Sequence, residues 1–99
     1  KVVVVEADLA ACLYKGAKVG DGSIQIVDGD MQTIMAGLAC GEGNTIGWDI
    51  LRNHVTVFAS CPDWMSAKAT RIYANPLEGD PLCLSVSATL PFMTKMQKI

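Results

Sequence analysis

The sequence is short of charge and has a single histidine. Asp, Glu, Lys and Arg together make up 18% of the residues, compared with about 25% in an average soluble domain. The net charge is −2 and the basic residues are scattered, which excludes the basic face that nucleic-acid binding requires. His54 is the only histidine, so mechanisms that need two are excluded. We interpret it as a histidine at a helix end, where the helix dipole favours a cation.

Long hydrophobic runs and paired cysteines are also missing. No apolar run approaches the roughly 18 residues of a membrane span, and residues 1–6 are too short for a signal-peptide core. We therefore expect a soluble, cytoplasmic protein. The C-x-x-C pair that zinc and thiol redox sites normally use is absent. The four cysteines are Cys12, Cys40, Cys61 and Cys83.

These cysteines are expected to be buried free thiols, and their even number leaves a disulfide open. Cys61 precedes Pro62 at a predicted helix start, where the pKa of a thiol falls, so it is the one candidate for a reactive cysteine. A cysteine-based redox protein is therefore a further hypothesis, which predicts an exposed thiol of low pKa.

Apolar residues are abundant for so short a chain. They make up 51% of the 99 residues, whereas a chain of this size buries only about 60 to 65% of its unfolded surface. We infer that part of the apolar surface faces a partner, either a second copy in a homo-oligomer or the remainder of a larger domain. The alternative is a small domain with a poorly soluble surface.

The hydrophobic pattern predicts an α/β fold, with helices packed on a small, mostly parallel sheet. The β-branched run from Val2 to Val5 is typical of a strand covered on both faces. Asp8 is expected to cap the first helix, and Asn44 or Thr45 the second. The predicted strands are 2–5, 23–27, 55–59 and 82–88, and the predicted helices are 9–19, 45–53 and 62–74. The residues expected to be buried on the second helix are Ile46, Ile50 and Leu51.

A nearly uncharged, glycine-punctuated stretch at 28–42 stands out between these elements. Its apolar residues repeat with helical spacing at Met31, Ile34, Met35 and Leu38, which predicts a short helix at 31–39. Gly37 weakens that helix by about 1 kcal/mol relative to alanine, and it would equally suit a loop whose backbone approaches a ligand. Asp28 and Asp30 resemble the start of a calcium loop but lack its later ligands, which favours turn and cap roles.

Several motifs resemble a known enzyme family. They are G-D-M-Q-T-I-M-A-G-L-A-C-G-E at 29–42, I-G-W at 46–48, S-C-P-D at 60–63 and N-P-L at 75–77. Over roughly residues 2–80 the chain resembles the diaminopropionate ammonia-lyases, a family of the fold-type-II pyridoxal-phosphate enzymes that also include threonine dehydratases and serine racemases. The T-I-x-x-G-L pattern at 33–38 is similar to a loop that faces the cofactor pocket in the wider family.

The resemblance implies an α,β-elimination that converts a small amino acid, 2,3-diaminopropionate, to pyruvate and ammonia, with pyridoxal phosphate as electron sink. Such chemistry needs a Schiff-base lysine and a glycine-rich phosphate loop. In the family both precede the matched segment, and this sequence contains neither. We therefore expect a catalytically incomplete fragment that carries no catalytic residue and does not bind the cofactor covalently by itself.

The resemblance also predicts site residues and domain limits. It implies cofactor contacts from Gly37 and Leu38, and a substrate-pocket wall that includes Thr33 and Cys40. Residues 1–88 are expected to be part of the cofactor domain, a larger three-layer domain. The family continues beyond the N-P-L-x-G-D turn with S-G-E-S-G, but this chain does not.

A shifted reading frame or an engineered end would explain that departure, and residues 89–99 are expected to be a divergent, poorly ordered tail. The alternative from another class of protein is a non-enzymatic α/β module that dimerises through its apolar surface.

Overall fold

The fold is built on two parallel strands. The computed structural model describes residues 1–79, and in this part β1 (Val2–Ala7) pairs with β2 (Val55–Cys61). Val3 lies opposite Val57 and Ala7 opposite Cys61, with one irregularity between Val2 and Val3. The predicted α/β fold with a parallel sheet is confirmed. The strand predicted at 82–88 and the tail predicted at 89–99 lie outside the described residues.

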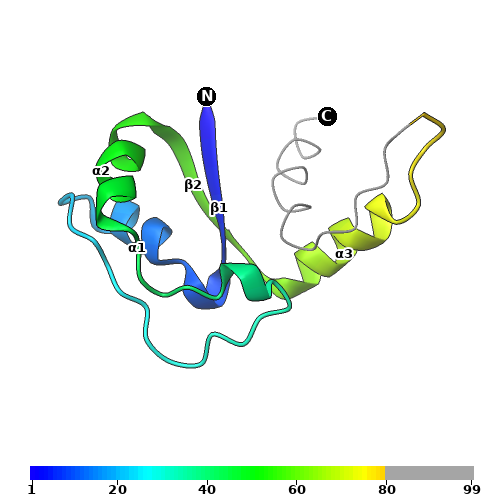
Figure 1. Cartoon of the computed structure of the whole chain (residues 1–99), viewed down its shortest axis with the longest axis horizontal. Helices are drawn as coiled ribbons and strands as arrows, with labels where there is room; N and C mark the ends of the chain where they lie inside the picture. The colour runs from blue at the N-terminus through cyan, green and yellow to red at the C-terminus, as the bar shows by residue number, and fades with distance from the viewer. Residues whose placement is uncertain (80–99) are drawn as a thin grey trace.

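In the described part of the chain, three α-helices accompany this sheet. α1 (Cys12–Val19) and α2 (Thr45–His54) lie on the same side of the strands, whereas α3 (Asp63–Tyr73) continues from the end of β2 and projects away from it (Figure 1). Two short 3₁₀ helices occur at Asp8–Ala10 and Ala36–Leu38. Within residues 1–79, no helix combines the length and the apolar character that crossing a membrane requires.

Burial along β1 is uneven, which corrects the expectation of a strand covered on both faces. Val2 and Val3 are 47% and 46% exposed, whereas Ala7 at the other end is buried. Ala7 forms a cluster with Met35 and Cys61, and Val5, Leu38 and Met65 pack against that cluster. The core therefore sits at the carboxyl ends of the two strands.

The strand predicted at 23–27 is wrong. Only an isolated antiparallel bridge joins Ile26 to Glu42. The segment instead makes local contacts: the Asp21 carboxylate accepts from the Ser23 amide at 2.8 Å and from its hydroxyl at 2.6 Å. The Lys15 ammonium donates to the Ile26 carbonyl at 3.0 Å. The Ile26 carbonyl, which would accept a backbone hydrogen bond in a sheet, therefore accepts from the Lys15 side chain. The neighbour of β1 is β2, which comes much later in the chain.

The start of α1 also differs from the prediction. Asp8 does not cap a helix from residue 9, because the chain forms a 3₁₀ turn, breaks at Ala11 and enters the α-helix at Cys12. The Glu6 carboxylate accepts from the amides of Leu13 at 3.1 Å and Tyr14 at 2.7 Å. An N-cap side chain normally satisfies these amides of the first turn. Glu6 does so from the neighbouring strand.

α2 has one of the two predicted caps, but it buries a different face from the one predicted. The Asn44 side chain accepts from the Gly47 amide at 2.8 Å, as a capping residue does. However, Ile46 and Ile50 are 76% and 58% exposed, whereas Trp48 is buried. Positions 46 and 50 lie on one face and position 48 on the opposite face, so burying the largest side chain exposes both isoleucines.

Specific contacts favour burial of the Trp48 ring. The ring lies 5.8 Å from that of Phe58, centre to centre. The indole N–H donates to the Gly22 carbonyl at 2.9 Å. A Cβ built on Gly16 would lie 3.0 Å from the indole, so glycine at this position lets α1 approach the ring. None of these partners is visible in the periodicity of α2 itself.

We predict that Glu6→Ala destabilises the chain and that Asp8→Ala does not. Removing Glu6 leaves two first-turn amides without their acceptor, and loss of a helix cap costs about 0.5–2 kcal/mol. The measurement is urea unfolding followed by circular dichroism. Asp8→Ala is the matched control, because Asp8 makes no capping contact to α1. Equal destabilisation by both substitutions would contradict the role of Glu6 as the cap.

Candidate functional site

A cavity of 310 Å³ lies against the carboxyl-terminal half of β1, between α1, α2 and the segment that joins them. Its wall is mainly apolar. The aliphatic residues that line it are Val4, Val5, Leu13, Leu38 and Leu51. Its position agrees with a general tendency of α/β proteins to bind ligands near the carboxyl ends of parallel strands.

Three of the four predicted site residues line this cavity. They are Gly37, Leu38 and Cys40. The helix predicted at 31–39 is reduced to a single 3₁₀ turn, Ala36–Leu38, so Gly37 lies in a turn rather than in a regular helix or an open loop. Met35 is fully buried immediately before this turn, whereas Ile34 is 51% exposed. The apolar side chains of the stretch therefore do not share one helical face.

Thr33, the fourth predicted residue, does not line the cavity. Its hydroxyl donates to the Asp63 carboxylate at the start of α3, and its oxygen accepts from the Met35 amide at 3.1 Å. The Ile34 amide donates to the other Asp63 oxygen at 2.9 Å. Thr33 thus connects the start of α3 to the segment that precedes the 3₁₀ turn of the cavity wall.

Glu6 also lines the cavity, which the sequence patterns did not predict. Besides accepting from α1, its carboxylate lies 3.7 Å from the Cys12 sulfur, which is also 3.7 Å from the Cys40 carbonyl. Burial raises the pKa of the Cys12 thiol, and the negative charge of Glu6 raises it further. The signal in the sequence was an isolated acid at the end of a β-branched run, directly before a helix.

The prediction of a reactive Cys61 is wrong. Its side chain is buried, and burial raises the pKa of the thiol, with smaller contributions from the nearby carboxylates of Asp8 and Asp63. Desolvation and two negative charges outweigh the helix N-terminus that would lower the pKa. Cys12 and Cys61 are buried and Cys40 is exposed, and all three are free thiols. Cys83 lies outside the described residues.

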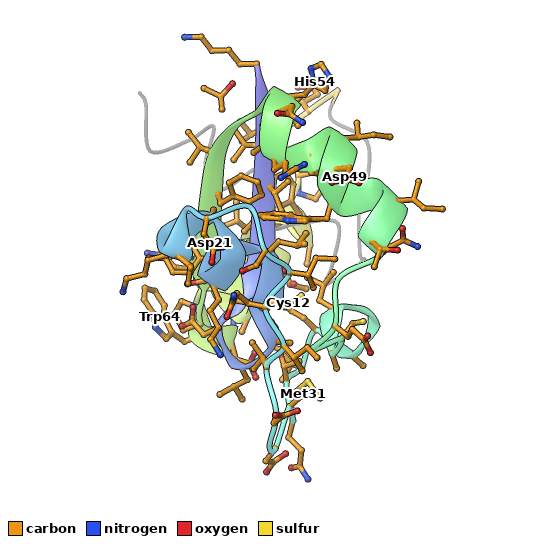
Figure 2. All side chains as sticks on the ribbon, turned by 90° about the vertical axis from the view of Figure 1, so that its left-hand side faces the viewer. Cys12, Asp21, Met31, Asp49, His54 and Trp64 are labelled. Atoms are coloured by element: carbon orange, nitrogen blue, oxygen red, sulfur yellow. The ribbon has the colours of Figure 1, made fainter. Side chains whose placement is uncertain are left out.

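The remaining candidates do not form a second site. His54 lies at a helix end, as predicted, because it is the last residue of α2. This end of α2 points away from Cys12, which belongs to α1 (Figure 2). Asp30 accepts from the Gln32 amide at 2.9 Å, which supports a turn role. Among residues 1–79, no three His, Cys, Asp or Glu side chains are grouped to hold a metal ion.

Gly41, near the end of the glycine-punctuated stretch, is required by the chain itself rather than by a ligand. Its carbonyl accepts from the Val27 amide at 2.8 Å. A Cβ built on Gly41 would lie 2.1 Å from the Val27 carbonyl oxygen. The two backbones therefore approach too closely for any side chain here.

The lining residues do not fit the reactive end of pyridoxal phosphate. They include no lysine to bond the aldehyde, and neither histidine nor arginine to face the phosphate. The acids present, Glu6 and Glu42, would repel a phosphate group. What the chain supplies is an apolar wall with thiols and backbone groups, which can shape a pocket and exclude water.

Comparison with known proteins shows that the sequence is similar to part of an enzyme. No protein-family model matches the chain. Over 83 residues, 84% of the chain, it is 51% identical to diaminopropionate ammonia-lyase of Escherichia coli K12. The chain matches a fragment of diaminopropionate ammonia-lyase. The lyase of Salmonella typhimurium LT2 is 50% identical over 78 residues, or 79% of the chain.

The similarity to diaminopropionate ammonia-lyase predicted from the motifs is therefore confirmed. The matched region is 20% of the E. coli lyase and 19% of the Salmonella lyase. The chain thus spans about one fifth of the length of the curated relatives it matches.

We expect native-state alkylation to modify Cys40 well before Cys12 and Cys61. Cys40 is exposed, whereas the other two are buried and have raised pKa values, so they form less of the reactive thiolate. The measurement is iodoacetamide labelling followed by mass spectrometry of the peptides. Labelling in urea is the control and should make all three equally reactive. Native labelling of Cys61 as fast as Cys40 would restore the reactive-thiol hypothesis.

We predict that Gly41→Ala destabilises the fold, because the added methyl group would overlap the Val27 carbonyl. The expected loss is about 1–3 kcal/mol in the free energy of unfolding. Gly47→Ala is the matched control. Its Cβ would meet atoms no closer than 3.5 Å, and alanine is favoured over glycine in a helix by up to about 1 kcal/mol. Both are measured by urea unfolding, and a neutral Gly41→Ala would refute the close approach.

Proposed function

We propose that this chain forms one wall of the reaction pocket of a diaminopropionate ammonia-lyase and contributes no catalytic side chain. The reaction would be the α,β-elimination of 2,3-diaminopropionate to pyruvate and ammonia. The observation that carries the proposal is the coincidence of motif and cavity. Gly37, Leu38 and Cys40 belong to the motif that resembles the family, and all three line one cavity. The 51% identity to the E. coli lyase supports the same assignment.

The chemistry of the cavity supports the view that the chain is incomplete. Glu6 is occupied by the two amides of α1, and Cys12 is a buried thiol beside it. The lining nucleophile nearest a base is the Cys12 sulfur, but the Glu6 carboxylate beside it already accepts from the α1 amides, and burial raises the pKa of the thiol. Lys15, whose ammonium donates to the Ile26 carbonyl, does not line the cavity. The reacting lysine and the phosphate-binding groups would therefore come from the part of the lyase that has no counterpart here.

The residues of this chain would act on the substrate indirectly. Val4, Leu13 and Leu51 give the pocket an apolar side that excludes water. The 3₁₀ turn Ala36–Leu38 contributes Gly37, which has no side chain, and Leu38 to the lining of the cavity. Pre-formed walls of this kind orient a small substrate and contribute through position rather than through proton transfer.

The proposal predicts that the chain alone forms no covalent adduct with pyridoxal phosphate. The measurement is absorbance after mixing, followed by borohydride reduction and mass spectrometry, with intact E. coli lyase as the positive control. A cofactor-modified lysine in this chain would contradict the proposal.

The proposal also predicts that co-expression of this chain with an E. coli lyase lacking the matched segment restores production of pyruvate from diaminopropionate. No activity above that of the deleted lyase alone would also contradict it.

A second candidate function is a non-enzymatic module that dimerises through apolar surface. The observation that favours it is the exposure of Ile46, Ile50 and Trp64, at 76%, 58% and 62%. Light scattering of the purified chain, with and without the complementary part of the lyase, separates the two candidates. A module forms a stable homodimer and ignores the complementary part. A wall segment binds that part, and the whole assembly is then expected to be a homo-oligomer.

A further inference from the structure

We infer that Asp63 is a positioning residue, which holds the cavity wall formed by Gly37, Leu38 and Cys40 in place from the start of α3. Its action on the wall depends only on this chain. Its effect on catalysis rests on the proposed function.

The Asp63 carboxylate fixes three consecutive residues. One oxygen accepts from the Thr33 hydroxyl and the other from the Ile34 amide at 2.9 Å. The Thr33 oxygen in turn accepts from the Met35 amide at 3.1 Å. Hydrogen bonds to an ionised carboxylate are stronger than neutral ones, and engaging both oxygens also fixes the direction of approach. Residues 33–35 are thereby tied to a helix that lies 30 positions later in the sequence.

Further hydrogen bonds connect these residues to the cavity wall. The Leu38 amide donates to the Met35 carbonyl at 2.7 Å, and the Ala39 amide donates to the Ala36 carbonyl at 3.2 Å. The Cys40 amide donates to the Leu38 carbonyl at 2.8 Å. A continuous series of hydrogen bonds therefore runs from the Asp63 carboxylate to Leu38 and Cys40, and Gly37 lies within the 3₁₀ turn that these bonds hold.

Packing restricts the same segment from a second direction. Met35 is fully buried in a cluster with Ala7 and Cys61, and Leu38 packs against that cluster. A short 3₁₀ turn has poor intrinsic stability, so such a segment depends on outside contacts to keep one conformation. Burial of Met35 sets the depth of the turn, and the two directional bonds to Asp63 set its orientation.

The place of Asp63 suits this role. It is the first residue of α3, a helix of 11 residues, where the helix dipole stabilises a negative charge. It follows β2 by two positions, so the sheet determines where its carboxylate stands. The carboxylate therefore has a fixed base in α3 and binds the segment that leads into the 3₁₀ turn.

Amide hydrogen exchange of the full chain tests the positioning role directly. With Asp63→Ala we expect the Leu38 and Ala39 amides to exchange about tenfold faster or more, because charge-assisted bonds are lost. The Trp48 amide, bonded to the Asn44 carbonyl in α2, should be unaffected. Thr33→Val removes one of the two bonds and should give an intermediate rate. Asp63→Asn, which keeps an acceptor for the Ile34 amide, should rescue part of the protection.

Asp49→Ala is the matched control. Asp49 is also a helical aspartate, but its partner is Arg52 at 3.0 Å on the surface of α2, so exchange at Leu38 and Ala39 should not change. Faster exchange at Leu38, Ala39 and Trp48 alike would mean that Asp63 only stabilises the whole chain, which would overturn the inference. Unchanged exchange at Leu38 and Ala39 in Asp63→Ala would overturn it as well.

The catalytic consequence is measured in the complex with the complementary part of the lyase. A displaced wall raises the KM for diaminopropionate, whereas a loss of folded chain lowers the number of active sites and leaves KM unchanged. We expect Asp63→Asn to raise KM several-fold and Asp49→Ala to leave it unchanged. An unchanged KM for Asp63→Asn would overturn the catalytic part. If the wild-type complex is inactive, the proposed function fails, while hydrogen exchange still decides the positioning role.

Discussion

The parallel pairing of β1 with β2 is the constraint on which the other contacts depend. Its register places Glu6 opposite Ser60 and Ala7 opposite Cys61. Because parallel strands end at the same edge, the chain segments that leave the two strands start close together. Glu6 at the end of β1 and Asp63 just beyond β2 therefore support the cavity from the same edge of the sheet.

These two carboxylates have equivalent roles in a protein that is poor in charge. Glu6 accepts from the first turn of α1, and Asp63 accepts from residues 33–34. Glu6 connects β1 to α1, which lines the cavity, and Asp63 connects the start of α3 to the segment that leads into the 3₁₀ turn of the cavity wall. Glu6 accepts from two backbone amides and Asp63 from one. Glu6 thus supports the cavity from within its lining, and Asp63 supports it from outside the lining. The lining itself remains mainly apolar.

The same arrangement also determines the surroundings of two thiols. Burial raises the pKa of the Cys12 and Cys61 thiols, and the nearby carboxylates raise it further. The wall consists of aliphatic side chains and a 3₁₀ turn. Under the proposed function, this segment shapes the pocket, and the reacting groups come from the rest of the lyase, of which the chain matches one fifth.

The sequence by itself determined the α/β class, a cap for α2 at Asn44 or Thr45, the end of α1 at Val19 and the similarity to the lyase, because these depend on local patterns or on whole motifs. It also pointed to Gly37, Leu38 and Cys40, which do share one cavity. Only the tertiary structure decided that Glu6 rather than Asp8 caps α1, that Trp48 displaces two isoleucines from the inner face of α2, and that Thr33 binds Asp63. Each of these outcomes depends on a partner between 7 and 30 positions away. Periodicity reports the spacing within one element, so it carries no information about which distant group will satisfy an amide, cover a ring or desolvate a thiol.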